Sequence, residues 1–218
     1  MKNIILIGAP ASGKGTISKI LTKEYKIPHI SVSQILSNIT NKNNEEAKLI
    51  KQYMEKGALV PDNIIIDVVK LRLKEKDCEN GYILDGFPRT LNQAEVFDKI
   101  TSNTNLKANF IINLSVEKEI LIERVIYRQI CKKCGASYNL IGKKPKIPDI
   151  CDVCFEPLVK RADDNKKTFL ERLKIYNNNL KKMIEFYEKN NYLLINIDGS
   201  MSIDDIVLNI KKIIDYGN

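Results

Sequence analysis

One loop near the amino terminus limits the possible folds more than any other feature of the sequence. It follows the apolar run Asn3-Ile4-Ile5-Leu6-Ile7, whose length and β-branching are typical of a buried strand. The loop has the spacing G-x-x-x-x-G-K and reads Gly8-Ala9-Pro10-Ala11-Ser12-Gly13-Lys14-Gly15-Thr16. In such a loop the backbone N–H groups surround a phosphate, the following helix adds positive potential, and Lys14 reaches the outer phosphates. The sequence therefore predicts a strand, a phosphate-binding loop and a helix.

The rest of the chain alternates short apolar runs with longer amphipathic stretches. Further strands are predicted near 29–32, 82–84, 110–114 and 192–197, and helices near 14–25, 45–56, 62–76, 91–99, 117–129, 164–190 and 202–214. This alternation is typical of a parallel sheet with helices on both faces. We therefore predict an α/β fold with a doubly wound, five-stranded parallel sheet. The segment 130–162 lacks a long apolar period, so we interpret it as an inserted module.

Asp85 directly follows the strand predicted at 82–84. A carboxylate at the carboxyl end of a strand beside the phosphate loop can hold a nucleotide-bound magnesium ion, directly or through water. A simple turn at the end of the strand is the alternative interpretation.

Four of the five cysteines form two pairs, C-x2-C, separated by sixteen residues: Cys131, Cys134, Cys151 and Cys154. This spacing is typical of a four-thiolate zinc site, and iron is the alternative metal. Disulfides are disfavoured because the chain shows no export signal. Four thiolates complete a tetrahedral shell, so the metal should be structural. Cys78 lies outside this group and is interpreted as a small buried side chain.

The net charge of +8 raises the question of nucleic-acid binding. The 29 lysines are scattered along the chain, which is typical of a solvated surface, so we expect no nucleic-acid partner. The six arginines are more informative, because a planar fork of donors fits phosphate or carboxylate. The single histidine, His29, excludes sites that need two imidazoles, and its apolar neighbours favour a packing or surface role.

No apolar run approaches the roughly 18 residues of a membrane-spanning helix. The apolar stretch after Met1-Lys2 is also too short for the core of a signal peptide. We therefore expect a cytoplasmic protein without a membrane partner.

The phosphate loop, the segment Asp85-Gly86-Phe87-Pro88-Arg89-Thr90 and the cysteine module flanked by arginines together resemble adenylate kinase of the zinc-knuckle lid type. The resemblance extends to about Ile214. It implies a core at 1–30, 61–126 and 165–218, an insertion that binds the nucleoside monophosphate at 31–60, and a zinc-binding lid at 127–164. It also implies phosphoryl transfer from Mg-ATP to AMP, giving two ADP, in a monomer whose partners are small nucleotides.

The acceptor site implied by the resemblance includes Arg89, which should bind the phosphate of AMP, and Gln93, which should read its adenine. The segment 57–62 resembles G-x-L-V-x-D, whose backbone lies against the acceptor base. The implied acceptor contacts are Val32, Ser37, Ala58, Leu59, Val60, Gly86, Phe87, Pro88, Arg89, Gln93, Arg161 and Arg172.

The implied donor site includes Arg124 against the adenine and Arg128 toward the phosphates, one helical turn further on. Arg161-Ala162-Asp163-Asp164 resembles R-x-D-D, in which the arginine closes over the phosphates and the aspartates help to hold the closed lid. The implied donor contacts are Ala11, Ser12, Gly13, Lys14, Gly15, Thr16, Arg124, Arg128, Ser137, Tyr138 and Met201. The implied catalytic residues are Lys14, Asp85, Arg89, Arg128, Arg161 and Arg172.

Two places depart from the family pattern. Ala11 stands where the family usually has glycine, so the loop is strained if this position needs a positive φ. The usual T-G-D-x-L-R is replaced at 32–37, where Val32, Gln34 and Ser37 take the places of threonine, aspartate and the arginine that grips the acceptor phosphate.

Three interpretations follow from these departures. The first is an adenylate kinase with a weakened or altered acceptor site. The second is a kinase for another donor and acceptor pair, such as GTP and AMP. The third is a nucleotide-binding protein of adenylate kinase type with little transferase activity.

Overall fold

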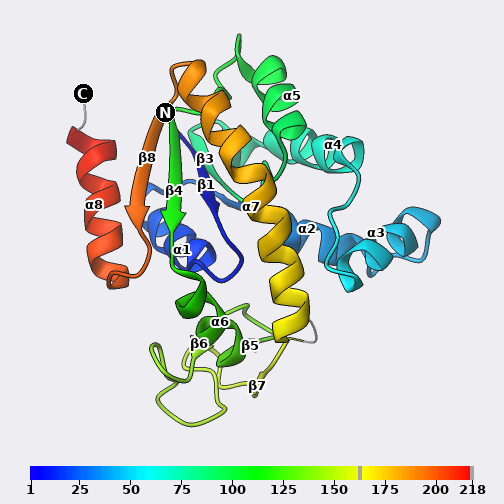
Figure 1. Ribbon diagram of the computed structural model, residues 1–218, viewed down its shortest axis with the longest axis vertical. Helices are drawn as coiled ribbons and strands as arrows, with labels where there is room; N and C mark the ends of the chain where they lie inside the picture. The colour runs from blue at the N-terminus through cyan, green and yellow to red at the C-terminus, as the bar shows by residue number, and fades with distance from the viewer. Residues whose placement is uncertain (162–163, 217–218) are drawn as a thin grey trace.

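Five parallel strands form the centre of the structure, a computed structural model that describes residues 1–161 and 164–216 (Figure 1). Their order in the sheet is β2-β3-β1-β4-β8. The strands are β1 (Lys2–Gly8), β2 (His29–Ser31), β3 (Gly81–Asp85), β4 (Phe110–Ser115) and β8 (Leu193–Asp198). All run in one direction, so their carboxyl ends meet at one edge, where parallel sheets bind ligands. This confirms the predicted fold class.

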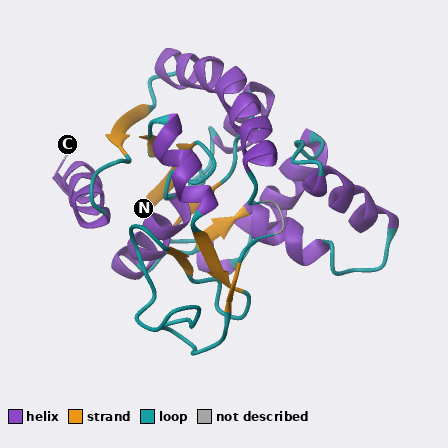
Figure 2. Cartoon of the chain, turned by 60° about the horizontal axis from the view of Figure 1, so that its bottom comes forward, coloured by secondary structure: helices purple, strands orange, loops and turns teal. Residues whose placement is uncertain are grey.

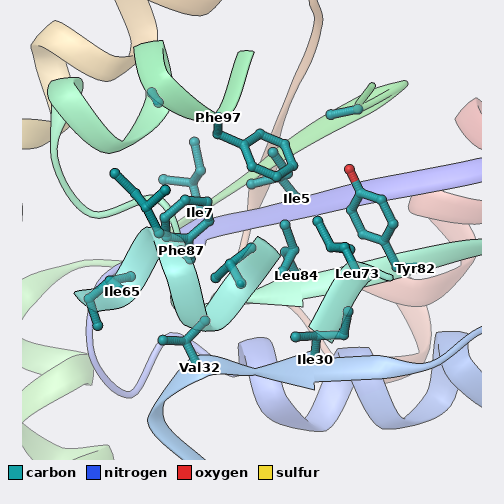
Figure 3. Packing of buried hydrophobic residues seen from close by; sticks show 14 of the residues in the cluster. Ile5, Ile7, Ile30, Val32, Ile65, Leu73, Tyr82, Leu84, Phe87 and Phe97 are labelled. Atoms are coloured by element: carbon teal, nitrogen blue, oxygen red, sulfur yellow. The ribbon is translucent and has the colours of Figure 1, made fainter. Parts of the chain in front are cut away.

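Helices cover both faces of the sheet, as Figure 1 shows. They are α1 (Lys14–Tyr25), α4 (Asp62–Leu73), α5 (Leu91–Thr101), α6 (Lys118–Ile126), α7 (Lys166–Lys189) and α8 (Ile203–Tyr216), with a short 3-10 turn, η1 (Lys76–Cys78). Alternate residues of β1 point to opposite faces. Ile4 and Leu6 pack with residues of α1 and α8, while Ile5 and Ile7 pack with residues of α4, α5 and α7 (Figure 3).

Two further helices, α2 (Val32–Ile39) and α3 (Glu45–Glu55), lie between β2 and α4. The strand predicted at 29–32 ends one residue earlier, because Val32 begins α2, which the sequence analysis did not predict. Apolar residues of α2 recur at the i, i+3, i+4, i+7 spacing of a helix and pack into or against the core: Val32, Ile35, Leu36 and Ile39. Because Val32 directly follows the strand residues, it resembled a continuation of that strand.

The cysteine-rich segment folds as a small antiparallel sheet with the order β6-β5-β7, at the bottom of the view in Figure 2. Its strands are β5 (Arg128–Cys131), β6 (Ser137–Asn139) and β7 (Leu158–Val159). The helix predicted at 117–129 is wrong over its last residues, because α6 ends at Ile126 and Arg128 begins β5. Arg124 and Arg128 therefore lie on different elements and not one helical turn apart.

No helix among residues 1–161 and 164–216 combines the length and the apolar character needed to cross a bilayer.

The turn between β1 and α1 contains Ala11 with a φ of 67°, in the left-handed region, and Gly13 with a φ of 101°. For a residue with a Cβ this region costs about 1–2 kcal/mol. The position therefore needs a positive φ, and the loop carries the strain that was expected in that case.

We predict that Ala11→Gly raises the free energy of unfolding by about 0.5–1 kcal/mol. Relief of the left-handed strain exceeds the roughly 0.4–1 kcal/mol of extra entropy that glycine gives the unfolded chain. Urea denaturation measures the change. Ala9→Gly is the matched control, since Ala9 is buried and has no positive φ, and it should be destabilising. A loss of stability in Ala11→Gly would contradict the account of strain.

Candidate active site

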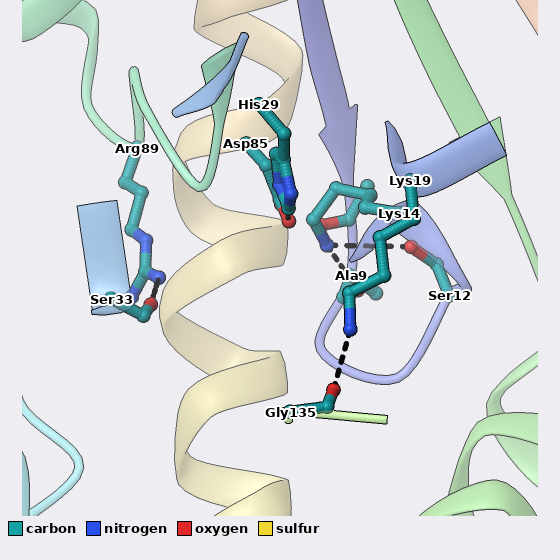
Figure 4. Close-up of polar contacts among 10 residues, drawn as sticks. Ala9, Ser12, Lys14, Lys19, His29, Ser33, Asp85, Arg89 and Gly135 are labelled. Atoms are coloured by element: carbon teal, nitrogen blue, oxygen red, sulfur yellow. Dashed lines mark hydrogen bonds and ion pairs between the residues drawn. The ribbon is translucent and has the colours of Figure 1, made fainter. Parts of the chain in front are cut away.

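Lys14 is the first residue of α1, and its ammonium group lies inside the loop that joins β1 to this helix (Figure 4). Nζ donates hydrogen bonds to the backbone oxygens of Gly8 at 2.7 Å and Ala9 at 2.9 Å. A Cβ at Gly8 would lie 2.6 Å from Ser12 Oγ and 3.1 Å from Leu114 O, so a larger residue would force the loop to shift. The close packing of the loop thus holds the ammonium group at the carboxyl end of β1.

Lys14 is one of four cationic residues from different elements that approach one another. Desolvation lowers the pKa of Lys14 to about 8; the charge of Asp85 opposes this shift, and the charges of Arg89 and Arg128 add to it. Desolvation also lowers the pKa of Arg89, with Asp85 again opposing and the charge of Arg172 adding to the effect. The site therefore has an excess of positive charge that a polyanion would compensate.

Asp85 ends β3 beside this cluster, and His29 at the start of β2 reaches it: His29 Nε2 lies 3.2 Å from Asp85 Oδ2. Burial alone would raise the pKa of Asp85, but the hydrogen bond from His29 and the charge of Lys14 lower it below its usual value. Asp85 is thus ionised at neutral pH, as a magnesium-binding carboxylate must be. His29 has a polar contact at the site, which its apolar sequence neighbours did not indicate.

Arg124, near the end of α6, is fixed by two backbone carbonyls. Nη2 donates to Gly199 O at 2.9 Å, and Nη1 lies 3.3 Å from Ser12 O. The guanidinium therefore joins the phosphate loop to the segment after β8. Met201, which follows in that segment, is partly buried against the core. The structure thus brings together Arg124, Met201 and the phosphate loop, which the sequence analysis expected around the donor.

Arg128, at the start of β5, forms a two-pronged ion pair with Asp164, whose side chain is 2% exposed. Nε donates to Asp164 Oδ2 at 2.7 Å, and Nη2 donates to the other carboxylate oxygen. Arg161 is exposed, and Asp163 lies outside the described residues. One aspartate of the R-x-D-D segment thus holds the arginine that the sequence analysis directed at the phosphates.

Lys19 connects the cysteine-rich segment to the core (Figure 4). Its Nζ, on α1, donates to Gly135 O at 2.6 Å. The sequence analysis did not identify this contact, because one exposed lysine on a helix resembles the others and the acceptor is a backbone atom. The segment after the first cysteine pair therefore touches the phosphate-loop helix directly.

Gln93 is 2% exposed and its amide is held at both ends. Oε1 accepts from the backbone N–H of Arg89 at 2.7 Å, and Nε2 donates to Asp62 Oδ1 at 2.6 Å. Asp62 also accepts hydrogen bonds from Thr90 at 3.1 Å and Asn92 at 2.7 Å. The last residue of the G-x-L-V-x-D segment therefore fixes the orientation of the amide expected to read the acceptor base.

Arg89 lies in the turn after β3 and reaches toward α2. Nε donates to Gly86 O and Nη2 donates to Ser33 Oγ, both at 2.9 Å. Arg172, on α7, lies beside the turn at Gly57, where a Cβ would be 3.6 Å from its Cγ and Nε. The structure thus brings Arg89, Arg172 and the turn at 57–58 together. Ser33 also belongs to this group through its contact with Arg89, and the sequence analysis did not single it out.

Several side chains expected to contact nucleotide are instead buried: Val32, Val60, Phe87, Pro88 and Tyr138. Contact with a ligand at these positions would have to use backbone atoms, because the side chains pack inside the protein. The other expected contacts outside the phosphate loop and the arginines, apart from Gln93, are partly or fully exposed: Ser37, Ala58, Leu59, Gly86, Ser137 and Met201.

The four cysteines of the two C-x2-C pairs form a compact cluster. Their Sγ atoms all lie within 4.8 Å of one another. A tetrahedral zinc with Zn–S bonds of about 2.3 Å requires sulfur–sulfur distances of about 3.8 Å. Two of the distances are 3.3 Å, between Cys131 and Cys154, and 3.5 Å, between Cys134 and Cys151. The donor set fits a closed structural zinc site.

Comparisons with known proteins agree with this geometry. Residues 6–192 match the family described as adenylate kinase. An adenylate kinase of Clostridium tetani is 44% identical over 97% of this chain and 98% of its own length. That of Thermotoga petrophila is 41% identical over 100% and 99%, and that of Methanocella arvoryzae is 43% identical over 96% and 97%.

The chain belongs to the adenylate kinase family. Its activity is the transfer of a phosphoryl group from ATP to AMP, which gives two ADP. Mg-ATP is the donor typical of the family, and the four thiolates indicate the zinc lid type. The first of the three interpretations of the sequence therefore holds as regards activity, and weakened binding of AMP stays a prediction.

We predict that ATP binding by this adenylate kinase takes up protons at about pH 9. Lys14, with a pKa of about 8, is mostly neutral there in the free enzyme, and the bound phosphates restore its charge. Affinity for ATP should therefore fall as the pH rises above about 8. Calorimetry in two buffers of different ionisation enthalpy measures the uptake as a large fraction of one proton. Lys14→Arg, which stays protonated, is the control and should show little uptake; equal uptake in both proteins would contradict the assignment.

Tyr138 supports the zinc site from inside the lid. Its hydroxyl accepts a hydrogen bond from the N–H of Asp152 at 2.8 Å and lies 3.6 Å from Cys151 Sγ. The hydroxyl proton is thus available to the thiolate, and groups that orient metal ligands in this way affect metal affinity about 10–100-fold.

We predict about one zinc per chain by elemental analysis, and a 10–100-fold loss of zinc affinity in Tyr138→Phe. Competition with a coloured chelator measures the loss. Tyr176→Phe removes a partly buried hydroxyl far from the cysteines, on α7, and should bind zinc as the natural chain does. If both variants lose zinc equally, the effect is one of general stability and the role of Tyr138 is refuted.

Proposed function

We propose that Lys14, Arg89, Arg128, Arg161 and Arg172 bind and align the phosphates of ATP and AMP for in-line transfer. The approach of four cations from separate elements carries this proposal: the charges of Arg89 and Arg128 act on Lys14, and that of Arg172 acts on Arg89. Such an arrangement is unfavourable without an anion and favourable around the charge of a transferring phosphoryl group. Arg161 is included on the resemblance of its segment to R-x-D-D.

The chemistry needs no general base, because the attacking oxygen belongs to a phosphate that is anionic at neutral pH. Asp85, held ionised by His29 and Lys14, would hold the magnesium of Mg-ATP. When bound, that ion supplies charge neutralisation at the phosphates. Lys14 and the arginines then supply position and electrostatic stabilisation.

We assign the donor base to the side of Arg124 and the acceptor base to the side of Gln93. Backbone carbonyls hold the guanidinium of Arg124, and Asp62 fixes the amide of Gln93. Segments 31–60 and 127–164 would act as the acceptor insertion and the lid, on a core of 1–30, 61–126 and 165–218. Closure of the lid would exclude water, which otherwise competes with AMP for the phosphoryl group. We further propose that the enzyme works as a monomer in the cytoplasm.

The acceptor site of this chain would bind AMP less tightly than a site with the full T-G-D-x-L-R motif. Ser37 stands where that pattern has a phosphate-gripping arginine. It is exposed and lies one helical turn after Ser33 on α2, so the two residues share a face. Because Ser33 contacts Arg89, an arginine at position 37 would extend toward the same phosphate.

We predict that Ser37→Arg lowers the KM for AMP by roughly tenfold or more and leaves the KM for ATP unchanged. One charge-assisted hydrogen bond contributes about 1.5–3 kcal/mol. A coupled assay that varies each nucleotide in turn provides the measurement.

Asn38→Arg is the matched control for this experiment, because it adds the same charge at the next exposed position of α2, on another face of the helix. If both variants change the KM for AMP equally, general attraction explains the gain and the proposed acceptor site is wrong. Absence of transfer to AMP in the natural chain would refute the proposed function as a whole.

A further inference from the structure

Ser33 is placed at the acceptor side by α2 and touches Arg89 (Figure 4). Its hydroxyl oxygen accepts a hydrogen bond from Arg89 Nη2 at 2.9 Å. The motif T-G-D-x-L-R has glycine at this position, so the hydroxyl and its contact depart from the motif.

The contact leaves most of the donors of Arg89 available. A guanidinium has five N–H groups, and two of them point to Gly86 O and Ser33 Oγ. Among the described residues no hydrogen bond is formed by Nη1. Three N–H groups therefore stay available, two on Nη1 and one on Nη2, and one from each nitrogen can together bind a phosphate.

The hydroxyl of Ser33 accepts one hydrogen bond and donates none to the described residues. Its oxygen accepts from Arg89, and within the part of the chain that the structure describes its proton has no hydrogen-bond acceptor. A hydroxyl that accepts from an arginine is polarised, which strengthens it as a donor. Ser33 O–H and the free fork of Arg89 are thus neighbouring donors, both suited to one anion.

The charges around Ser33 favour an anion rather than a neutral group. Arg172 lies close enough to lower the pKa of Arg89, although Asp85 opposes that shift. Ser33 stabilises the orientation of the guanidinium as a neutral acceptor, whereas a carboxylate at this position would cancel its charge. Arg89 therefore stays oriented with its full charge available.

We infer that Ser33 is an acceptor-binding residue: its hydroxyl orients Arg89 and donates to the phosphate of the nucleoside monophosphate, replacing part of the phosphate binding lost at position 37. This inference rests on the proposed function, because it assigns Arg89 to the acceptor phosphate. The inference predicts that removal of the hydroxyl oxygen of Ser33 weakens the binding of AMP and leaves the binding of ATP unchanged.

The test compares Ser33→Ala, Ser33→Gly and Ser33→Thr with the natural chain in the coupled assay. We expect Ser33→Ala and Ser33→Gly to raise the KM for AMP by about tenfold, as for a lost hydrogen bond to a charged group, with the KM for ATP unchanged. Ser33→Thr keeps the hydroxyl and should recover most of the loss. Asn38→Ala removes an exposed polar group from the same helix and should change neither constant.

A second outcome distinguishes the two roles that the contact allows. If Ser33 merely held Arg89 away from the phosphate, Ser33→Gly would lower the KM for AMP, and this result would overturn the inference. An unchanged KM for AMP in Ser33→Ala would overturn it as well, while transfer to AMP by the natural chain would leave the proposed function standing. Absence of transfer in the natural chain would refute both.

Discussion

Four cationic side chains gather at the carboxyl ends of the strands, and Asp85 and Asp164 offset part of their charge. Lys14, Arg89, Arg128 and Arg172 come from a helix, a turn, a lid strand and a second helix, and their proximity is unfavourable in the absence of an anion. A loosely packed scaffold would let them separate. The buried sheet, covered on both faces, holds the elements that carry these cations in place. On the proposed assignment, a bound polyphosphate relieves their repulsion.

The lid contributes to this cluster through a different kind of support. Its own apolar core is small, and its strands are two to four residues long. Elements of this size need a metal or disulfides for stability. Strand β5 carries Arg128 at its first residue and the zinc ligand Cys131 at its last. Zinc bound at Cys131 would therefore stabilise the strand that begins three residues earlier with Arg128, which on the proposed assignment connects a structural site to the reaction.

The sequence predicted the parts of the molecule that depend on local pattern. The order of strands and helices follows from the periodicity of apolar residues. The phosphate loop and the cysteine pairs could be recognised because each motif consists of a few neighbouring residues. The sequence analysis predicted strain at Ala11 only if this position has a positive φ, because the residue type alone does not determine φ. The end of α6 before Arg128 was missed, because the helical pattern continues into β5 and short strands held by a metal have little pattern of their own.

Other parts of the site depend on tertiary contacts and could not be predicted. His29 meets Asp85 because β2 lies beside β3, and Lys19 meets Gly135 because the lid folds back on α1. The contact of Ser33 with Arg89 needs α2, whose first apolar residue resembled the end of a strand. In each case one partner lies in a segment whose place in space is set by elements distant in the chain, so sequence neighbours carry no signal.

The acceptor side balances charge repulsion against affinity. An arginine at position 37 would add a further cation within one helical turn of Ser33 and increase the repulsion on Arg89 in the free protein. A carboxylate at position 33 would relieve that repulsion but would compete with the phosphate for Arg89. A hydroxyl avoids both effects, because it accepts from the guanidinium and still carries a proton for an anion. On the proposed assignments, this chain therefore gives up part of its affinity for AMP and lowers the electrostatic cost of holding the site ready.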